Sequence, residues 1–61
     1  MFNLYEVSII FKDGSMHVGH WVAQNALTAR AYAIEQYEYF HSHWAHKLMC
    51  GTITRVINYD L

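Results

Sequence analysis

Residues 4–22, LYEVSIIFKDGSMHVGHWV, carry the pattern that decides the fold. Apolar side chains alternate along residues 4–12 with a period of two, which is typical of a half-buried β-strand. Asp13 and Gly14 follow this segment and precede a second apolar one. An Asp-Gly pair in this setting is a strong hairpin signal, because both residues tolerate positive φ angles. The stretch therefore predicts an antiparallel β-hairpin.

A two-residue turn at Asp13 and Gly14 would also set the register of that hairpin. The expected pairs are Ile9 with Val18, Val7 with His20, and Tyr5 with Val22. This register collects the aliphatic side chains on one face and leaves Trp21 and Ile10 on the other. His20 would be the polar residue of the aliphatic face, either as a core histidine held neutral by one hydrogen bond or as a ligand-binding group.

The pattern changes from strand to helix after residue 24, where alanines replace β-branched residues in NALTARAYAIEQYEYF, residues 25–40. Asn25 can cap the first turn, and the expected core stripe runs through Leu27, Ala31 and Ile34. We expect the helix to reach residue 40 or beyond. Gly51 as a left-handed end residue would extend it to about Met49, whereas Ser42 could instead cap a second, short turn.

A third strand is predicted from TITRVINYD, residues 52–60, because its β-branched residues alternate. The fold class is therefore α+β, with the order ββαβ. We expect one domain, residues 1–61, formed by a three-stranded antiparallel sheet with one long helix packed on one face and the last strand beside the first. The other sheet face has no cover, and such apolar surfaces usually mark interfaces.

Composition indicates a partner and excludes several kinds of target. Apolar residues make up 54% of the 61-residue chain, more than a core of this size can bury, so we expect a homodimer. The single Cys50 excludes an internal disulfide framework. With a net charge of -1 and four Lys and Arg, we expect no nucleic-acid partner. The chain lacks a long apolar run and a secretory leader, so we expect no membrane partner and a cytoplasmic location.

The segment FHSHWAHKLMC, residues 40–50, raises the question of a metal site. On a continuous helix His43, His46 and Cys50 would share a face, and Zn²⁺ favours imidazole and thiolate ligands. Its fourth ligand is missing unless His17 or His20 supplies it. Histidines near the end of a helix also complement its dipole without any metal. We therefore expect no metal and no cofactor, and keep a zinc-stabilised binding module as an alternative.

The sequence does not predict an enzyme, because Cys50 lacks the base, orienting group and oxyanion hole that a nucleophile needs. Aromatic side chains are abundant instead, and Trp and Tyr are enriched at the energetic centres of protein interfaces. We expect the partner-binding residues to be Trp44, Tyr39, His43 and Trp21. Trp44 is the leading anchor, because the helix is expected to outrun the sheet at that point.

Two stretches resemble the helix and last strand of small phage-encoded host-takeover proteins, such as the phage inhibitor of bacterial RNA polymerase. They are AQNALTARAYAIEQY, residues 23–37, and, after a gap, GTITRV, residues 51–56. The shared elements are an Ala-rich helix after a strand, a Gln-Tyr pair, and a strand that begins with glycine. The resemblance implies a compact, non-enzymatic protein from a phage or other mobile element.

These observations lead to three hypotheses about function. The first is a small interaction protein that binds and inhibits a host protein of the transcription or defence machinery, in the host cytoplasm. The second is the zinc-stabilised binding module. The third is a homo-oligomer that sequesters a small nucleotide-like ligand between its subunits.

Overall fold

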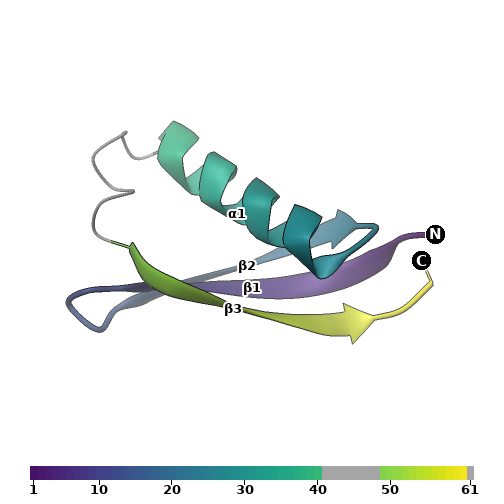
Figure 1. Cartoon of the computed structure of the whole chain (residues 1–61), viewed down its shortest axis with the longest axis horizontal. Helices are drawn as coiled ribbons and strands as arrows, with labels where there is room; N and C mark the ends of the chain where they lie inside the picture. The colour runs from purple at the N-terminus through teal and green to yellow at the C-terminus, as the bar shows by residue number, and fades with distance from the viewer. Residues whose placement is uncertain (41–48, 61) are drawn as a thin grey trace.

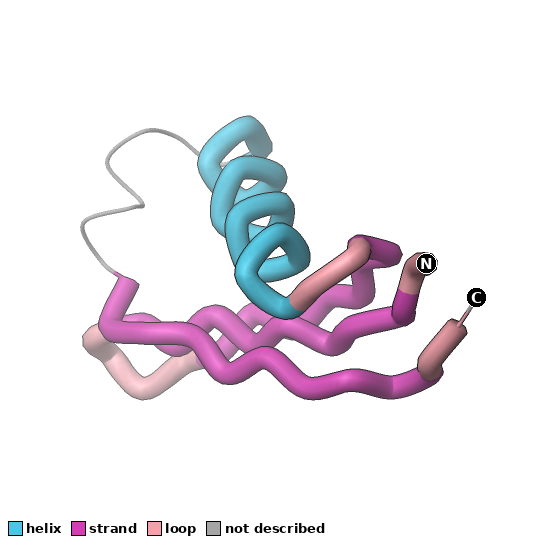
Figure 2. Tube along the Cα trace, turned by 45° about the vertical axis from the view of Figure 1, so that its right-hand side comes forward, coloured by secondary structure: helices cyan, strands magenta, loops and turns pink. Residues whose placement is uncertain are grey.

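The computed structural model describes residues 1–40 and 49–60. Along the chain it contains β1 (Asn3–Phe11), β2 (Met16–Ala23), α1 (Ala26–Phe40) and β3 (Met49–Asn58). β1 is the central strand of the sheet, antiparallel to β2 on one side and to β3 on the other. α1 covers one face of the sheet, while the opposite face has no described element over it (Figures 1 and 2). The predicted α+β fold and the position of the last strand beside the first are confirmed.

The hairpin between β1 and β2 closes through a three-residue loop, so the predicted two-residue turn is wrong. Gly14 N donates a hydrogen bond to Phe11 O, and Phe11 N donates one to Ser15 O, both at 2.9 Å. Gly14 has a φ of +89°, and a left-handed residue at the end of a three-residue loop is a common hairpin geometry. Asp13 Oδ1 accepts hydrogen bonds from Ser15 N at 2.9 Å and Ser15 Oγ at 2.6 Å, which stabilise this loop.

The additional loop residue shifts the register of the hairpin by one. The observed pairs are Tyr5 with Trp21, Val7 with Gly19, and Ile9 with His17. Because side chains alternate along a strand, this shift turns every side chain of β2 to the opposite face. Trp21, expected on the uncovered face, instead lies on the helix side and packs against the core. His20, expected on the aliphatic core face, is exposed on the uncovered side.

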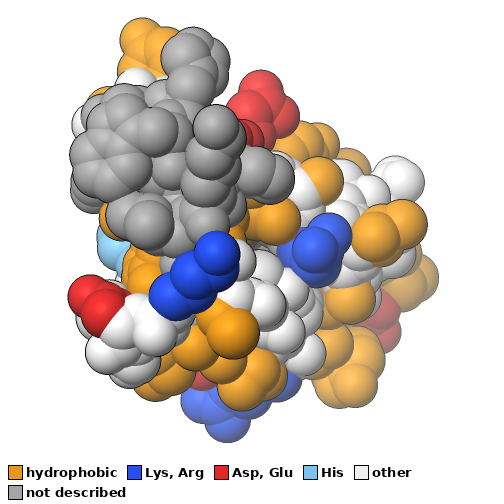
Figure 3. Space-filling view, turned by 60° about the vertical axis from the view of Figure 1, so that its left-hand side comes forward, with side chains coloured by type: hydrophobic (Ala, Val, Ile, Leu, Met, Phe, Trp, Pro, Cys, Tyr) orange, Lys and Arg blue, Asp and Glu red, His pale blue; other side chains and the backbone are white. Residues whose placement is uncertain are grey.

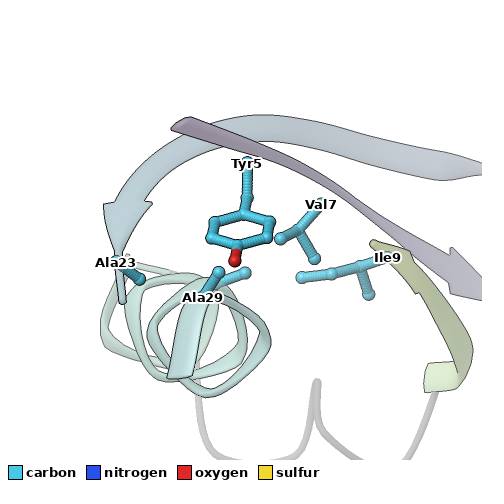
Figure 4. Packing of buried hydrophobic residues seen from close by; sticks show 6 residues of the cluster. Tyr5, Val7, Ile9, Ala23 and Ala29 are labelled. Atoms are coloured by element: carbon cyan, nitrogen blue, oxygen red, sulfur yellow. The ribbon is translucent and has the colours of Figure 1, made fainter. Parts of the chain in front are cut away.

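The core lies between the sheet and α1 and is small. It consists of Tyr5, Val7, Ile9, Ala23, Ala29 and Ala33. Figure 4 shows Tyr5, Val7 and Ile9 projecting from β1 towards the helix, with Ala29 facing them. Alanines on the helix allow α1 to approach the sheet closely, so the large core side chains all come from the central strand.

α1 begins as predicted but presents a different face to the sheet. Asn25 Oδ1 accepts a hydrogen bond from Thr28 N at 2.8 Å, which confirms the predicted N-cap. The buried positions are Ala29 and Ala33, whereas Leu27 is 73% exposed, so the predicted core stripe through Leu27 and Ala31 is wrong. Leu27 precedes Ala29 by two residues, which places it about 200° away on the opposite side of the helix. Among the described residues, no helix combines the length and apolar character needed to cross a membrane.

β3 begins at Met49, three residues before the expected start, and the possible extension of the helix to Met49 is therefore wrong. The pairing with β1 shifts between Ile10, opposite Gly51, and Phe11, opposite Met49, which makes Cys50 the extra residue of a bulge. From Thr52 to Val56 the predicted alternation is confirmed, and a second register shift follows at Ile57, between Val56 opposite Tyr5 and Asn58 opposite Leu4. Ile53 and Arg55 are exposed, and Thr52, Thr54 and Val56 are partly covered on the helix side.

Candidate protein-binding surfaces

Two aromatic side chains project into solvent at the last described turn of α1. Tyr39 is 82% exposed and Phe40 is 72% exposed. Their rings meet edge to face, with centroids 5.1 Å apart and planes at 88°. This is a favoured aromatic geometry, and it presents two adjacent apolar rings to water. We call these two residues the aromatic surface.

Beside the aromatic surface lies an open pocket of about 340 Å³. It is lined by His17, Trp21, Gln36, Tyr37 and Phe40. Tyr37 is held in its wall by ring contacts with Phe11, at a centroid distance of 5.1 Å, and with His17, at 5.0 Å. Phe40 contributes to both the pocket and the aromatic surface, so the two form one continuous aromatic region between β2 and the end of α1.

A second surface is the sheet face that α1 does not cover, which we call the open sheet face. It is formed by Leu4, Glu6, Ser8 and Ile10 of β1, Met16, Val18, His20 and Val22 of β2, and Ile53 and Arg55 of β3. The apolar members from β2 and β3 are all about half exposed. Figure 3, which views the molecule from the side, shows hydrophobic side chains interspersed with a few Lys, Arg, Asp and Glu side chains. The open sheet face is therefore an apolar surface with a limited number of charges.

The charges of the open sheet face form one row across the three strands. Glu6 lies opposite His20 on β2 and opposite Arg55 on β3. Arg55 Nε donates a hydrogen bond to Glu6 Oε1 at 2.9 Å, and His20 Nε2 lies 3.4 Å from Glu6 Oε2. The hydrogen bond from Arg55 is the main cause that holds the pKa of Glu6 below its ordinary value of 4.5, and the same bond raises the pKa of Arg55. The carboxylate is thus matched by the Arg55 guanidinium and lies beside the His20 imidazole, both on its own chain.

The structure places the residues that the sequence suggested for partner binding in different environments. Tyr39 is part of the aromatic surface, and Trp21 lines the adjacent pocket rather than the open sheet face. His43 and Trp44 lie outside the described residues, so their proposed roles stay predictions. The structure therefore brings together Trp21 and the end of α1, which were expected on separate surfaces.

The alternative metal site falls mostly outside the described part of the chain. His46 and His43 are not described, and Cys50 is exposed on β3 as a free thiol. Among residues 1–40 and 49–60, no group of three His, Cys, Asp or Glu side chains is arranged to hold a metal ion. His17 faces α1 and His20 faces the opposite side of the sheet, so they do not approach one another as joint ligands.

Sequence reasoning missed two features of these surfaces. It did not assign Phe40 or Gln36 to a site, because the pocket exists only where β2 meets the helix end. It also placed Val18 and Val22 in the core, so the aliphatic character of the open sheet face was missed. The Asp13 side chain, which can accept hydrogen bonds from Ser15 in a longer loop, is the sequence signal that could have indicated the other register.

Comparison with known proteins adds no functional assignment. No protein-family profile, curated protein or solved structure matches this chain at a significant level.

Proposed function

We propose that this chain is a small non-enzymatic interaction protein that binds and inhibits a host protein through the aromatic surface at the end of α1. The observation that carries the proposal is the exposure of Tyr39 and Phe40 as two touching rings beside a pocket. Aromatic side chains contribute large contact areas at low entropic cost, and they are enriched at interface hot spots. A partner that covers both rings would remove from water the apolar surface of Tyr39 and Phe40 and also apolar surface of its own.

The pocket supports this role, because a protruding side chain of the partner could enter it. Its lining is mainly aromatic, and Gln36 and His17 add polar groups to this lining. The phage or mobile-element origin, the host cytoplasm as location, and a target in the transcription or defence machinery rest on the sequence resemblance described above.

The test is affinity capture from a bacterial lysate with immobilised wild-type protein and a Tyr39→Ala/Phe40→Ala variant. We expect the wild type to retain a specific protein and the variant to lose at least about tenfold in affinity for it, since truncation of a hot-spot residue costs about 2 kcal/mol or more. Leu27→Ala is the matched control, because Leu27 is similarly exposed at the other end of the same helix. Trp44→Ala tests the leading anchor predicted from sequence.

Two results would contradict the proposal. One is that the folded wild type retains no specific protein. The other is that Tyr39→Ala/Phe40→Ala binds the captured partner as well as Leu27→Ala does. Circular dichroism of each variant establishes beforehand that it is folded.

A second candidate function is sequestration of a small nucleotide-like ligand, which the aromatic pocket favours. Its volume of about 340 Å³ is within the usual range for small-molecule sites, and aromatic walls can stack on a planar base. Native mass spectrometry of protein purified without denaturation distinguishes this function. A bound small molecule that is lost in Trp21→Ala would favour sequestration over protein binding.

A further inference from the structure

We propose that the open sheet face is the interface between two copies of this chain, packed face to face so that two three-stranded sheets form a sandwich. This interface is separate from the aromatic surface and does not depend on the proposed function. Four features favour this interface: the apolar rows of the face, its internally balanced charges, the small size of the core and the dimensions of the sheet.

Aliphatic side chains lie on both sides of the charged row. Towards the hairpin loop, Val18 and Ile53 lie opposite Ser8 on either side of β1, and Met16 lies opposite Ile10. Towards the other end, Val22 lies opposite Leu4. Val18 is 47% exposed and Ile53 is 57% exposed, so a large part of each side chain remains to be buried. Two inner faces with such rows pack about 10 Å apart in β-sandwiches.

The balance of charge favours a second copy over a partner of different chemistry. A two-fold symmetric interface places the same surface on both sides, so a face with charges of a single sign would repel itself. Here the carboxylate of Glu6 is already hydrogen-bonded to Arg55 and lies beside His20 on its own chain. The face therefore requires no oppositely charged partner. Desolvation of this row lowers the affinity of the dimer, as is usual when ion pairs are buried.

The small core gives a reason for a constitutive partner. Val7 and Ile9 are the largest fully buried side chains, and alanines supply half of the core cluster. Domains of about 60 residues are marginally stable unless a disulfide, a metal or another subunit adds to the core. A second copy is present wherever the chain is made, so burial of the open sheet face would always be available to stabilise the fold.

The dimensions of the sheet are sufficient for a small dimer interface. The Cα atoms extend over 34 × 20 × 14 Å, and Figure 1, viewed down the shortest axis, shows α1 above the sheet. The sheet therefore occupies at most about 34 by 14 Å, or about 480 Å² in projection, before side chains add to the accessible area. The smallest specific interfaces bury about 600 Å² per partner. We accordingly expect a dimer with micromolar affinity.

Sedimentation equilibrium of the full chain from about 5 to 500 μM tests the inference. We expect the average mass to rise from 7.2 kDa towards twice that value. Val18→Glu and Ile53→Glu should each raise the dimer dissociation constant by about 100-fold, because each change removes apolar contact twice and brings two carboxylates into the interface. Leu27→Glu is the control, because Leu27 is exposed on the far side of α1, and it should leave the constant unchanged.

A methyl NMR dilution series on the wild type gives a readout that requires no variant to fold. Chemical shifts of the Val18, Val22 and Ile53 methyl groups should change on dilution, while those of Leu27 should not. The inference is overturned if the wild type stays at 7.2 kDa throughout. It is also overturned if Val18→Glu and Ile53→Glu dimerise like the wild type, which would indicate pairing through a sheet edge or through the aromatic surface.

Discussion

The indole ring of Trp21 lies over Gly19, in the space that a side chain on residue 19 would occupy. An ideal Cβ atom built on Gly19 would overlap the six-membered part of the ring. Both residues are on the helix side of β2, so the missing side chain allows the indole to lie over Gly19 and to line the pocket. The shape of the aromatic region thus depends on a glycine that sequence reasoning did not single out.

Gly19→Ala should displace the Trp21 ring and destabilise the protein by about 1–3 kcal/mol, as overpacking usually does. Urea denaturation measures the loss. In a Trp44→Phe background Trp21 is the remaining tryptophan, so its fluorescence should shift to longer wavelength as the ring is exposed. Gly51→Ala is the control, because a Cβ atom on Gly51 would have no other atom within 4 Å, and it should change stability by no more than about 1 kcal/mol. Equal stability of the two variants would contradict the observed ring position.

The left-handed conformation of Gly14 predicts a selective response to substitution in the hairpin loop. Gly14→Ala should cost about 1–2 kcal/mol, because a Cβ atom at φ +89° collides with the backbone. Gly14→Asn should cost less, since asparagine tolerates this region. Thermal or urea denaturation compares the two at one protein concentration. The loop geometry is wrong if alanine is tolerated better than asparagine.

The N-cap of α1 predicts a loss of stability when its acceptor is removed. Asn25→Ala should lower the free energy of unfolding by about 1 kcal/mol, because Thr28 N loses its hydrogen bond. Asn25→Asp should retain most of the stability, since a carboxylate accepts the same bond and interacts favourably with the positive end of the helix. Gln24→Ala, at the exposed neighbouring residue, serves as the control in urea denaturation. A loss with Gln24→Ala equal to that with Asn25→Ala would argue against the cap.

The row formed by Glu6 and Arg55 predicts a pH-dependent contribution to stability. The pKa of Glu6 is lowered in the folded protein, so the stabilisation is present above the ordinary value of 4.5 and is lost as the pH falls through the folded pKa. Glu6→Gln should therefore have a lower free energy of unfolding than the wild type at pH 7. This difference should shrink as the pH falls below 4.5. Urea denaturation across this range, at a fixed protein concentration, measures it.

Arg55→Gln removes the main partner of Glu6. The difference in stability between the wild type and Arg55→Gln should therefore depend on pH in much the same way as the difference between the wild type and Glu6→Gln. The double variant Glu6→Gln/Arg55→Gln closes a mutant cycle that isolates the interaction between the two side chains. The contrary result is a difference in free energy of unfolding between the wild type and Glu6→Gln that stays constant from pH 7 into acid. Such a result would show that the lowered pKa of Glu6 does not contribute to stability.

The helix illustrates what local pattern can and cannot predict. Its start at Ala26 follows from Asn25, whose side chain satisfies a local backbone donor, and such local chemistry can be read directly from sequence. Its buried face could not be read in this way. Alanines occur at positions 26, 29, 31 and 33, on several sides of the helix. Tyr5 and the other β1 side chains fill the space above the sheet, so the helix packs through Ala29 and Ala33, and Leu27 remains outside.

Four features follow from the sequence alone: the order of the elements, the hairpin, the capped helix and the alternation along β3. Each of them depends on residues close together in the chain. The faces of β2 and of α1 were decided only in the tertiary structure. A single additional loop residue reverses every side chain of β2, and apart from the contacts of Asp13 with Ser15, local chemistry hardly distinguishes the two registers. Trp21 lies between Gly19 and the helix end, whereas Val18 and Val22 face away from α1. The aromatic pocket and the apolar open sheet face therefore both arise from one register, which is selected by packing against the helix.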